Sequence, residues 1–450
     1  MVRYHSCGMT CRGRFLSFTF CTFILVIVLF YIELNFQPQI NGARIKARWY
    51  QIQNEYTGDM NTVSNDDLNI TFINVFNASK NKKIQPARNH SEVTTTVYKY
   101  DNHSMPWPVL QTTKEADNYI RSKVHIVIVV SYMRSGSTLT ADIMQHFPKT
   151  LYVFEPFHQL YIRTRNGLPM HYLDGTFKKL TQDDITDEFL KNELMKWIDC
   201  RYWELDIHSL TDTFHAQFSR SMQQVYKCFI GKPRTIEMVR KCIPDAIEKC
   251  QKVKHRLFKF IRLPMRVVRS IFPVYPNLQV VHLVRDPRGS LTSQINLNVT
   301  SWGEIDSASR RFCHRVADDL NSTLYLNYFF PHRSKILIYE KLAENPLETA
   351  KKLFTYIDMP SYSYVLRYIS KLTMEGRQGK NPFGYFRKNS TKTAYNWRDS
   401  VDLDHVQTID NNCEMIYNFL GFKKFTNFAD LRDHNQNTLD MNNHSIYIAT

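Results

Sequence analysis

The stretch VVSYMRSGSTLTADIM, residues 129–144, joins a run of β-branched residues to a serine-rich turn and then to a helical pattern. The run begins at residue 124 (VHIVIVV), and such a run is typical of a strand buried on both faces of a parallel sheet. Where the helix starts, backbone N–H groups, the helix dipole, hydroxyls and Arg134 would converge on one anion. We expect a strand, a phosphate-binding turn and a helix to about Gln145. The alternative is an ordinary turn in which Ser137 caps the helix.

The turn differs from the phosphate loop of nucleoside triphosphatases. That loop needs GxxxxGK[ST], in which the lysine reaches the β- and γ-phosphates and the hydroxyl holds Mg²⁺. Here a serine follows Gly136, no glycine precedes it in the loop, and the cation Arg134 comes before the turn. A magnesium-bound triphosphate is therefore disfavoured.

Four more apolar runs predict further strands, at residues 151–154, 258–263, 279–284 and 335–339. A helix should begin at Asn345-Pro346, with proline in the first turn. Another should begin with Asp404 as N-cap and Gln407 three residues on, and end at Gly421. Strands that alternate with helices predict an α/β fold with a mostly parallel central sheet flanked by helices.

A second motif, VVHLVRDPRGSLTSQ, spans residues 280–294. Arg285 follows the buried strand, Asp286 can cap the next helix, and Pro287 fits its first position. Ligands of α/β proteins bind at the carboxyl ends of such strands, where Arg285 could hold an anion and Ser293 could add a hydroxyl. Two anion sites suggest one ligand with two phosphate-type groups. A surface ion pair between Arg285 and Asp286 is the alternative.

The turn RSGST, the later FEPFH (residues 154–158) and LVRDPRGSLTS (residues 283–293) together resemble the Golgi carbohydrate 6-O-sulfotransferases. Members of that family modify galactose, N-acetylgalactosamine or N-acetylglucosamine. The resemblance continues through residues 339–360 and 396–422, and so covers most of residues 124–422. It implies a P-loop-like sulfotransferase fold and 3′-phosphoadenosine 5′-phosphosulfate (PAPS) as sulfuryl donor. The sequence contains no CxxC pair and no HExxH helix, so no metal is expected.

The resemblance also assigns residues to the donor. The family's 5′-phosphosulfate loop, usually R-[ST]-G-S-S, matches the turn with threonine in last place, and its 3′-phosphate motif matches RDPR and the serine beyond it. A Trp-Arg pair of the family matches Trp397-Arg398. The predicted donor-binding residues are Arg134, Ser135, Gly136, Ser137, Thr138, Leu139, Arg285, Asp286, Pro287, Arg288, Ser293 and Arg398.

Sulfuryl transfer needs a base for the sugar hydroxyl and cationic groups for the charge that develops on the leaving phosphate. The resemblance supports Glu155 as the base. Arg134 or Ser137 would then contact the sulfate and 5′-phosphate and offset the developing charge, and Arg134 is predicted to be the charged catalytic group. Pro156 should keep the backbone of Glu155 extended. A plain exposed glutamate is the alternative, and His158 is a rival base because its unperturbed pKa is nearer neutrality. The basic segment at residues 376–400, with Arg387 and Lys388, is predicted to be a lid.

Residues 15–32, FLSFTFCTFILVIVLFYI, form an uncharged run close to the length that crosses a bilayer. A buried helix and a cleaved signal peptide are the alternatives to a signal anchor. Arg12 and Arg14 precede the run, and every Asn-x-Ser/Thr acceptor follows it. We expect a type II Golgi protein with a cytosolic tail (1–14), a transmembrane anchor (15–32), a luminal stem (33–118), a catalytic domain (119–435) and a C-terminal tail (436–450).

The body of the chain contains six cysteines: Cys200, Cys228, Cys242, Cys250, Cys313 and Cys413. Disulfides fit an oxidising lumen, but the connectivity stays open, and buried free thiols are the alternative. The net charge of +16 favours anionic partners such as sulfated or sialylated glycans, or is simply a soluble basic surface. Nucleic acid is not an expected partner in a lumen.

These observations predict an enzyme that transfers a sulfuryl group from PAPS to the 6-hydroxyl of a hexose or N-acetylhexosamine in a glycoprotein or proteoglycan glycan. The rivals are a nucleotide-dependent kinase and a noncatalytic glycan-binding relative with the same fold. The acceptor sugar, set by segments such as residues 167–220, stays open, and so does a homo-oligomer.

Overall fold

A five-stranded parallel sheet forms the centre of the molecule. The computed structural model of the chain describes residues 123–374, 387–441 and 445–448. The strand order is β2-β5-β1-β6-β7, and every neighbouring pair is parallel. The strands are β1 (His125–Val130), β2 (Thr150–Phe154), β5 (His255–Phe260), β6 (Leu278–Val284) and β7 (Ser334–Ile338). The predicted α/β fold is confirmed, and only β5 differs from its predicted bounds by more than one residue.

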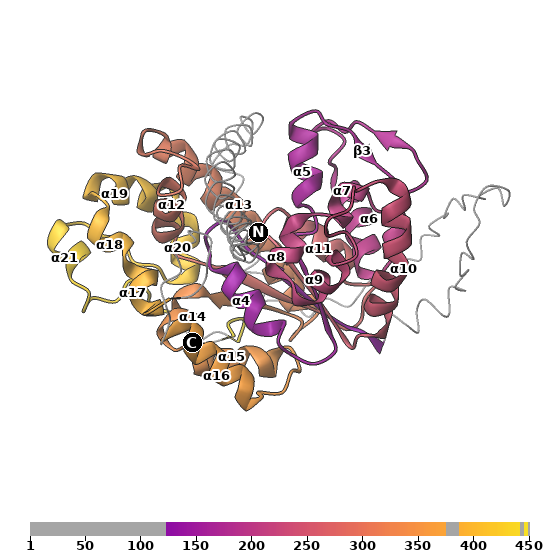
Figure 1. Ribbon diagram of the computed structural model, residues 1–450. Coiled ribbons are helices and arrows are strands. Elements are labelled where there is room, and N and C mark those ends of the chain that lie inside the picture. The colour runs from indigo at the N-terminus through magenta and orange to yellow at the C-terminus, as the bar shows by residue number, and fades with distance from the viewer. Residues whose placement is uncertain (1–122, 375–386, 442–444, 449–450) are drawn as a thin grey trace, which may run out of the picture.

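Helices cover both faces of this sheet (Figure 1). Between β1 and β5 lie α4 (Ser137–Met144), α5 (His158–Arg165), β3 (Met170–His171), β4 (Phe177–Lys178), α6 (Asp187–Ile198), η1 (Tyr202–Glu204), α7 (Ile207–Leu210), α8 (Thr213–Phe218), α9 (Arg220–Tyr226) and α10 (Ile236–Lys252). Between β5 and β7 lie α11 (Met265–Ile271), α12 (Pro287–Ile295), η2 (Trp302–Glu304) and α13 (Ile305–Phe329). After β7 come α14 (Tyr339–Glu344), α15 (Pro346–Tyr356), α16 (Ser363–Thr373), α17 (Ser390–Tyr395), α18 (Trp397–Ser400), α19 (Leu403–Asn412), α20 (Glu414–Leu420) and α21 (Phe428–Arg432).

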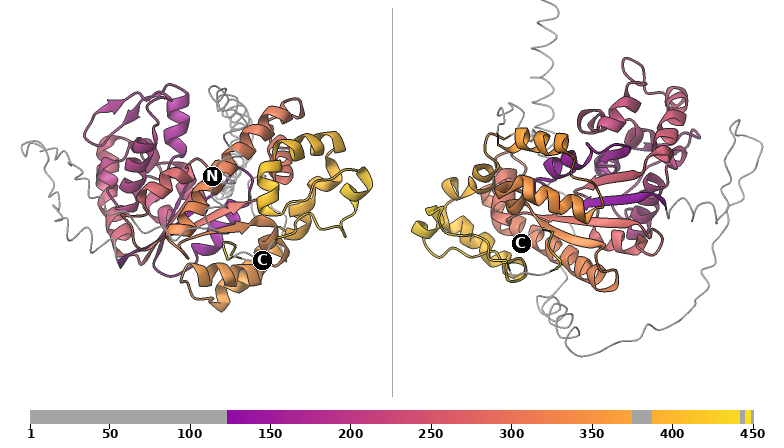
Figure 2. Two further views of the ribbon diagram at one scale, coloured as in Figure 1. Left: turned by 180° about the vertical axis from the view of Figure 1, so that it is seen from behind. Right: turned by 90° about the horizontal axis from the view of Figure 1, so that it is seen from below.

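The alternation of side chains along the strands explains this layering. In β1, Ile126, Ile128 and Val130 belong to the core cluster that includes α6, α10 and α11, whereas Val127 and Val129 belong to the cluster of α4, α15 and α16. Both faces of the strand are therefore buried, as the β-branched run predicted. The front and back views show α5 to α11 at one side of the molecule and α17 to α21 at the opposite side, with the sheet between them (Figures 1 and 2).

The predicted helices are partly confirmed. Helix α15 begins at Pro346 as expected. The helix expected from Asp404 to Gly421 is instead two helices, α19 and α20, with Asp402 as the first N-cap. They are separated at Cys413, which a disulfide ties to α13. Gly421 ends α20 with a φ of 85°, as predicted.

All six cysteines of the body are paired, so the alternative of free thiols is wrong. The bonds are Cys200–Cys250, Cys228–Cys242 and Cys313–Cys413. The first two lie within the part of the chain that includes α6 to α10, and the third joins α13 to the C-terminal helices.

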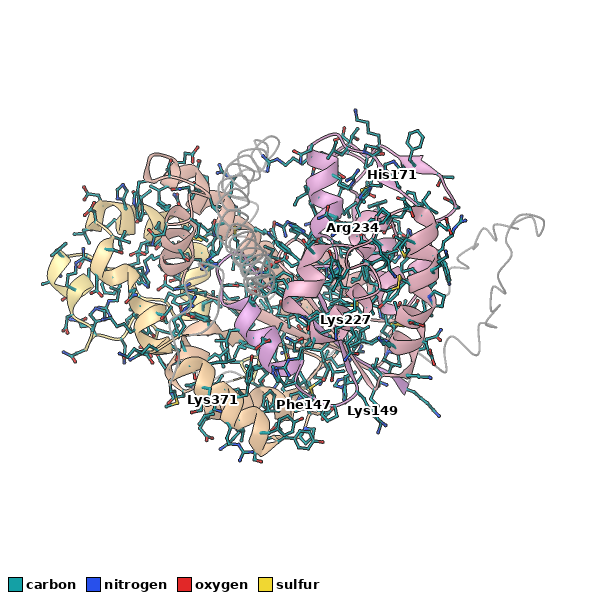
Figure 3. All side chains as sticks on the ribbon, viewed as in Figure 1. Phe147, Lys149, His171, Lys227, Arg234 and Lys371 are labelled. Carbon is teal, nitrogen blue, oxygen red and sulfur yellow. A yellow bond between two sulfur atoms is a disulfide. The ribbon has the colours of Figure 1, made fainter. Side chains whose placement is uncertain are left out.

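Side chains of the later helices close the second face of the sheet. Phe147, labelled in Figure 3, follows α4 and packs edge-on against Phe354 of α15 at 4.8 Å between ring centroids. Near the C-terminus, Ile336 of β7 exchanges backbone hydrogen bonds with Ile446 and Ile448. The segment predicted as a C-terminal tail thus packs against the catalytic body.

The predicted cytosolic tail, anchor and stem (1–14, 15–32 and 33–118) lie outside the described residues, as does the start of the catalytic domain at residue 119. Within the described ranges, none of the helices has the combined length and apolarity that crossing a bilayer requires.

Candidate active site

The carboxyl ends of all five parallel strands carry charged or polar groups at one edge of the sheet. Because the strands are parallel, the residues that follow them lie along the same edge. In sheet order these residues are Glu155 after β2, Lys259 in β5 with Arg262 beyond it, Arg134 after β1, Arg285 after β6, and Tyr339 after β7. The two predicted anion motifs therefore occupy adjacent strands.

The phosphate-binding turn has the expected strand–turn–helix form. Arg134 and Gly136 both have positive φ, 66° and 86°. The Ser135 hydroxyl is buried and donates to the Tyr132 carbonyl at 2.7 Å, so it builds the turn. Gly136 is the N-cap of α4 and no side chain caps the helix, so the alternative of Ser137 as cap is wrong. The first N–H groups of α4 are thus left without a side-chain cap, as the predicted anion site requires.

A close contact explains the glycine in this turn. A Cβ at Gly136 would lie 2.2 Å from Cδ2 of Tyr339. Tyr339 in turn lies under the guanidinium of Arg285, 4.8 Å from ring centroid to Cζ. The turn, the tyrosine and the arginine form one stack across β1, β6 and β7. Leu139, also predicted to bind donor, is buried in the core cluster of α4.

The two predicted motifs contact each other directly. Arg285 donates from Nη1 to the carbonyl of Arg134 at 2.9 Å, and Arg134 donates from Nε to the Ser293 hydroxyl at 3.0 Å. Burial lowers the pKa of Arg134 to about 10, with the charges of Arg285 and Arg387 acting in the same direction. Several cations share this space, as an anion site requires.

Hydrogen bonds fix the guanidinium of Arg285, but they do not use all of its N–H groups. It is buried, and Nη2 donates to the carbonyl of Ala394 at 3.3 Å. Its Nε makes no hydrogen bond within the described residues but lies 3.8 Å from Oε1 of Glu340, at ion-pair distance. Below it, Glu340 accepts from the Asp286 N–H at 3.2 Å through Oε1, and its Oε2 has no partner. Burial and the charge of Asp286 raise the pKa of Glu340 to about 8, against the effect of Arg285. The raised pKa favours the protonated form of Glu340, which would offset the charge of Arg285 less than a carboxylate does.

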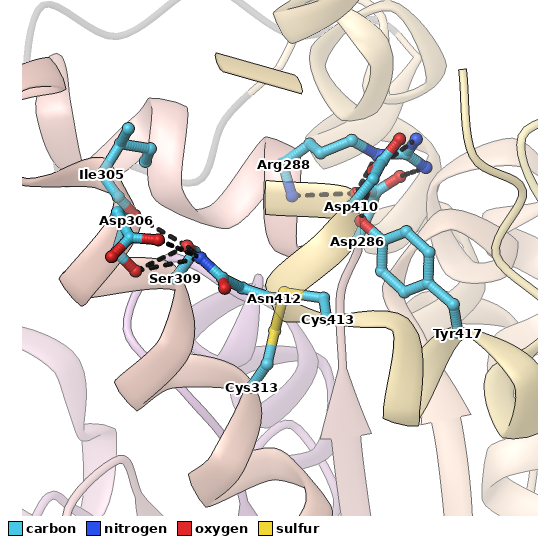
Figure 4. The surroundings of a disulfide bond; sticks show 10 residues. All are labelled: Asp286, Arg288, Ile305, Asp306, Ser309, Cys313, Asp410, Asn412, Cys413 and Tyr417. Atoms are coloured by element: carbon cyan, nitrogen blue, oxygen red, sulfur yellow. Dashed lines mark hydrogen bonds and ion pairs between the residues drawn. A yellow bond between two sulfur atoms is a disulfide. The ribbon is translucent and has the colours of Figure 1, made fainter. Parts of the chain in front are cut away.

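The remaining residues of the second motif stabilise the helix rather than face the phosphate turn. Asp286 caps α12 by accepting from the Arg288 N–H, and Pro287 takes the first position, both as predicted. Arg288 is fully buried and pairs with Asp286 at 2.8 Å and with Asp410 at 3.2 Å (Figure 4). The structure thus turns Arg288 toward the C-terminal helices and away from the predicted donor site.

Arg398 also has a different environment from the predicted one. Its guanidinium donates to the backbone carbonyls of Asp430, Leu431, Asp433 and Gln436 at 2.6–3.0 Å. It fastens α18 to the segment around α21. Arg387 influences Arg134, Lys388 is exposed, and residues 376–386 of the predicted lid lie outside the described ranges.

Glu155 lies at the end of β2 as predicted, but its backbone is not extended, because its φ is 47°. Its N–H donates to the Lys259 carbonyl at 2.9 Å and its carbonyl accepts from the His158 N–H at 2.9 Å. These contacts, together with the side-chain pairs, outweigh the preference of a residue before proline.

The carboxylate of Glu155 is buried and doubly paired. Lys259 donates to Oε1 at 2.6 Å, and Arg262 donates to Oε2. Burial raises the pKa of Glu155, but Lys259 and Arg262, with a smaller effect of His158, outweigh burial and lower it. In this state the carboxylate is a weak base.

His158, the rival base, belongs to a second buried pair. Its Nδ1 lies 2.6 Å from Oδ2 of Asp212, and its ring stacks on Phe214 at 4.2 Å. Burial opposes ionisation of Asp212, but the hydrogen bond and charge of His158 lower its pKa to about 2. His158 follows Glu155 closely in the sequence, and its backbone N–H donates to the Glu155 carbonyl.

Sequence reasoning missed several of these groups. Lys259 and Arg262 were absorbed into an apolar run, although cations inside the run FKFIRL are themselves a signal. Tyr339 and Glu340 were assigned to the resemblance without a role, and Asp212 lies in a segment that offered no recognisable motif.

Comparison with known proteins identifies the family of the chain. The profile of the sulfotransferase family matches residues 127–363. Carbohydrate sulfotransferase 1 of Homo sapiens is 25% identical over 352 residues, covering 69% of this chain and 82% of that protein. Carbohydrate sulfotransferase 6 of Homo sapiens is 23% identical over 337 residues, covering 67% and 81%. Among solved structures, the sulfotransferase domain of the Synechococcus PCC 7002 olefin synthase covers 64% of this chain and is covered to 95%, at 15% identity and a TM-score of 0.33, too low to carry an argument.

Proposed function

This chain belongs to the sulfotransferase family, and from that premise we propose that it transfers a sulfuryl group from PAPS to the 6-hydroxyl of a hexose or N-acetylhexosamine in a glycan. The observation that carries the proposal is the contact of the two anion motifs at the ends of the adjacent strands β1 and β6, on the same edge of the sheet as Glu155. The carbohydrate acceptor is supported by the relatives, which are named carbohydrate sulfotransferases. The 6-position rests on the sequence resemblance.

The residues at the site fit a donor with two separate anionic groups. The turn of Gly136 and the N-terminus of α4 suit the 5′-phosphosulfate, with Arg134 beside them. Arg285, whose Nε makes no hydrogen bond within the described residues, suits the 3′-phosphate. PAPS supplies a sulfuryl group joined to a phosphate leaving group, and none of these contacts needs magnesium.

The reaction requires one proton acceptor and one set of positive charges. The sugar oxygen forms a bond to sulfur, the bond from sulfur to the bridging phosphate oxygen breaks, and its electron pair stays with the phosphate. We assign the hydroxyl proton to the carboxylate of Glu155, and the charge on the leaving phosphate to Arg134. His158 is the rival acceptor.

The compartment is part of the proposal. A type II protein of the Golgi membrane, with residues 15–32 as anchor and a luminal catalytic domain, is consistent with three disulfides in the body. An oxidising lumen would also bring the enzyme to its glycan acceptors, on glycoproteins or proteoglycans.

The test is an assay of the full chain with labelled PAPS and, separately, labelled ATP. The acceptor panel spans chondroitin, keratan-type and N-acetylglucosamine-terminated glycans, and the sulfate position is identified. We expect sulfate on a 6-hydroxyl and no phosphate transfer. Phosphate transfer without sulfate transfer would support a kinase, and donor binding without transfer to any acceptor would support a noncatalytic binder.

Two variants test the proton acceptor. Glu155→Gln should lower kcat by about 100-fold or more, since general-base catalysis contributes about that much. His158→Gln should lower it less. If Glu155→Gln keeps wild-type kcat while His158→Gln loses it, the assignment to Glu155 is wrong and the pair of His158 and Asp212 takes the proton.

A further inference from the structure

Two buried cations next to Glu155 have no role in the function proposed above. Lys259 is 2% exposed, and its Nζ lies 2.6 Å from Glu155 and 4.3 Å from the centroid of the Phe154 ring. Arg262, 8% exposed, donates to the other oxygen of the same carboxylate. A single carboxylate thus pairs with two cations, and either cation could instead contact a ligand at the carboxyl ends of the strands.

The charges at this edge do not balance. Lys259 and Arg262 both pair with one carboxylate, Glu155, and the charge of Arg134 acts on Lys259. Burial lowers the pKa of Lys259, and the charges of Arg262 and Arg134 lower it further, although Glu155 acts in the opposite direction. His158, on the other side, is already paired with Asp212. Because an uncompensated buried charge is costly, the excess of positive charge calls for an anion at this place.

The position of Lys259 indicates which anion. In the sheet register Lys259 is opposite Val129 of β1 and Phe154 of β2. It therefore lies between the strand that leads into the phosphate turn and the strand that carries Glu155. The lysine that a GK[ST] loop holds after its last glycine is absent from the turn, but a lysine from the neighbouring strand lies beside it.

We propose that Lys259 and Arg262 bind the sulfuryl end of the donor, and that Glu155 becomes the proton acceptor only when they have moved from its carboxylate to the donor. This inference rests on the proposed function, because it takes PAPS as donor. With the donor absent, Glu155 is neutralised by two cations. With the donor bound, the sulfuryl oxygens compete for those cations, and the buried carboxylate, left with fewer counter-charges, becomes a stronger base.

The first experiment measures binding of PAPS and of adenosine 3′,5′-bisphosphate, which lacks the sulfate, by titration calorimetry. Lys259→Gln should weaken PAPS binding by about tenfold or more, the loss expected for a hydrogen bond to a charged group. The bisphosphate should lose markedly less affinity. Lys252→Gln, an exposed lysine of α10 paired only with Glu248, is the matched control for lost charge and should change neither affinity.

Charge-balanced variants keep the test valid if Lys259→Gln alone unfolds. Glu155→Gln should bind PAPS at least as tightly as wild type, because the cations are no longer shared. The double variant Glu155→Gln/Lys259→Gln removes one charge of each sign and should still show the weakened PAPS binding. If the double variant recovers wild-type affinity for PAPS, Lys259 only neutralises Glu155 and the inference is overturned.

A pH profile tests the coupling to Glu155. The acidic limb of kcat/KM should shift to higher pH in Lys259→Gln, since one counter-charge of Glu155 is removed while Arg262 and His158 remain. Equal losses for PAPS and the bisphosphate, or an unshifted limb, would contradict the inference. A wild-type protein that binds neither nucleotide would instead refute PAPS as donor, so the two failures are distinguishable.

Discussion

At the scale of single residues, the site contains a buried carboxyl group whose pKa is raised. Glu340 is fully buried under Arg285, one of its oxygens has no partner, and its pKa is raised to about 8. A neutral Glu340 supports the backbone of Asp286 without cancelling the charge that Arg285 presents. The deprotonated form would add a negative charge beneath a predicted phosphate site.

This carboxyl makes the stability of the protein depend on pH in a defined direction. The folded-state pKa is above the ordinary value, so the folded protein binds more protons than the unfolded chain between about pH 4.5 and 8. Stability should therefore fall as pH rises through that window. Glu340→Gln should remove the fall and, at pH 8, gain on the order of 3 kcal/mol over wild type, as measured by urea unfolding at a series of pH values.

The matched control is Glu348→Gln, an exposed glutamate of α15 that pairs with Lys351. Its difference from wild type should be small and independent of pH. A Glu340→Gln protein that gains nothing between pH 5 and pH 8 would show that Glu340 is ionised in the folded state.

At the scale of elements, the phosphate turn depends on the packing of three strand ends. Gly136 has a φ of 86°, and any Cβ there would meet the ring of Tyr339 at 2.2 Å. Gly136→Ala should therefore lower the free energy of unfolding, because alanine is strained at a positive φ and its Cβ clashes with the ring. Together these effects should cost on the order of 3 kcal/mol, and the variant should also bind nucleotide more weakly. Chemical unfolding and calorimetry measure the two effects.

Gly175→Ala separates the two costs. Gly175 has a φ of 94° and no atom within 4 Å of an added Cβ, so it carries the backbone penalty alone. The excess loss in Gly136→Ala over Gly175→Ala is the cost of the contact with Tyr339. Equal losses, with nucleotide binding intact, would mean that the ring moves aside freely and that the turn does not depend on it.

The central strands were largely predictable, for a local reason. Most of them are apolar runs rich in β-branched or aromatic residues, and Asp286-Pro287 is a local helix-start signal, so neighbours in sequence determine them. The helices between β2 and β5 carried no such signal and were not predicted one by one. Partners distant in sequence decide the rest. Lys259 meets Glu155 across about a hundred residues of chain, and Arg288 meets Asp410 across more. An arginine in a recognised motif cannot be assigned to ligand or to scaffold until those partners are known.

At the scale of the whole molecule, the second motif is held by the C-terminal helices. Arg288 of α12 pairs with Asp410 of α19, and three residues beyond Asp410 the chain is tied by Cys413 to Cys313 of α13 (Figure 4). The rings of Trp397, Tyr417 and Phe425 surround the same guanidinium. These contacts hold Arg288 and with it the start of α12. Arg285 lies three residues before Arg288, so the same contacts help to position Arg285.

Two of the three disulfides should therefore differ in how far they stabilise the fold and in whether they affect nucleotide binding. In the chain-entropy estimate, a bond that closes a loop of about 100 residues stabilises by about 5 kcal/mol, and one that closes about 15 residues by about 3 kcal/mol. Cys313–Cys413 closes 100 residues and Cys228–Cys242 closes 14.

Replacing Cys313 and Cys413 by alanine should cost the larger amount of stability, as measured by urea unfolding. It should also weaken binding of adenosine 3′,5′-bisphosphate, because α19 no longer holds Asp410 firmly against Arg288. Replacing Cys228 and Cys242, which lie outside this network, should lower stability but leave the affinity of the folded protein unchanged. If both pairs of substitutions leave nucleotide affinity intact, the C-terminal helices stabilise the fold without positioning the second motif.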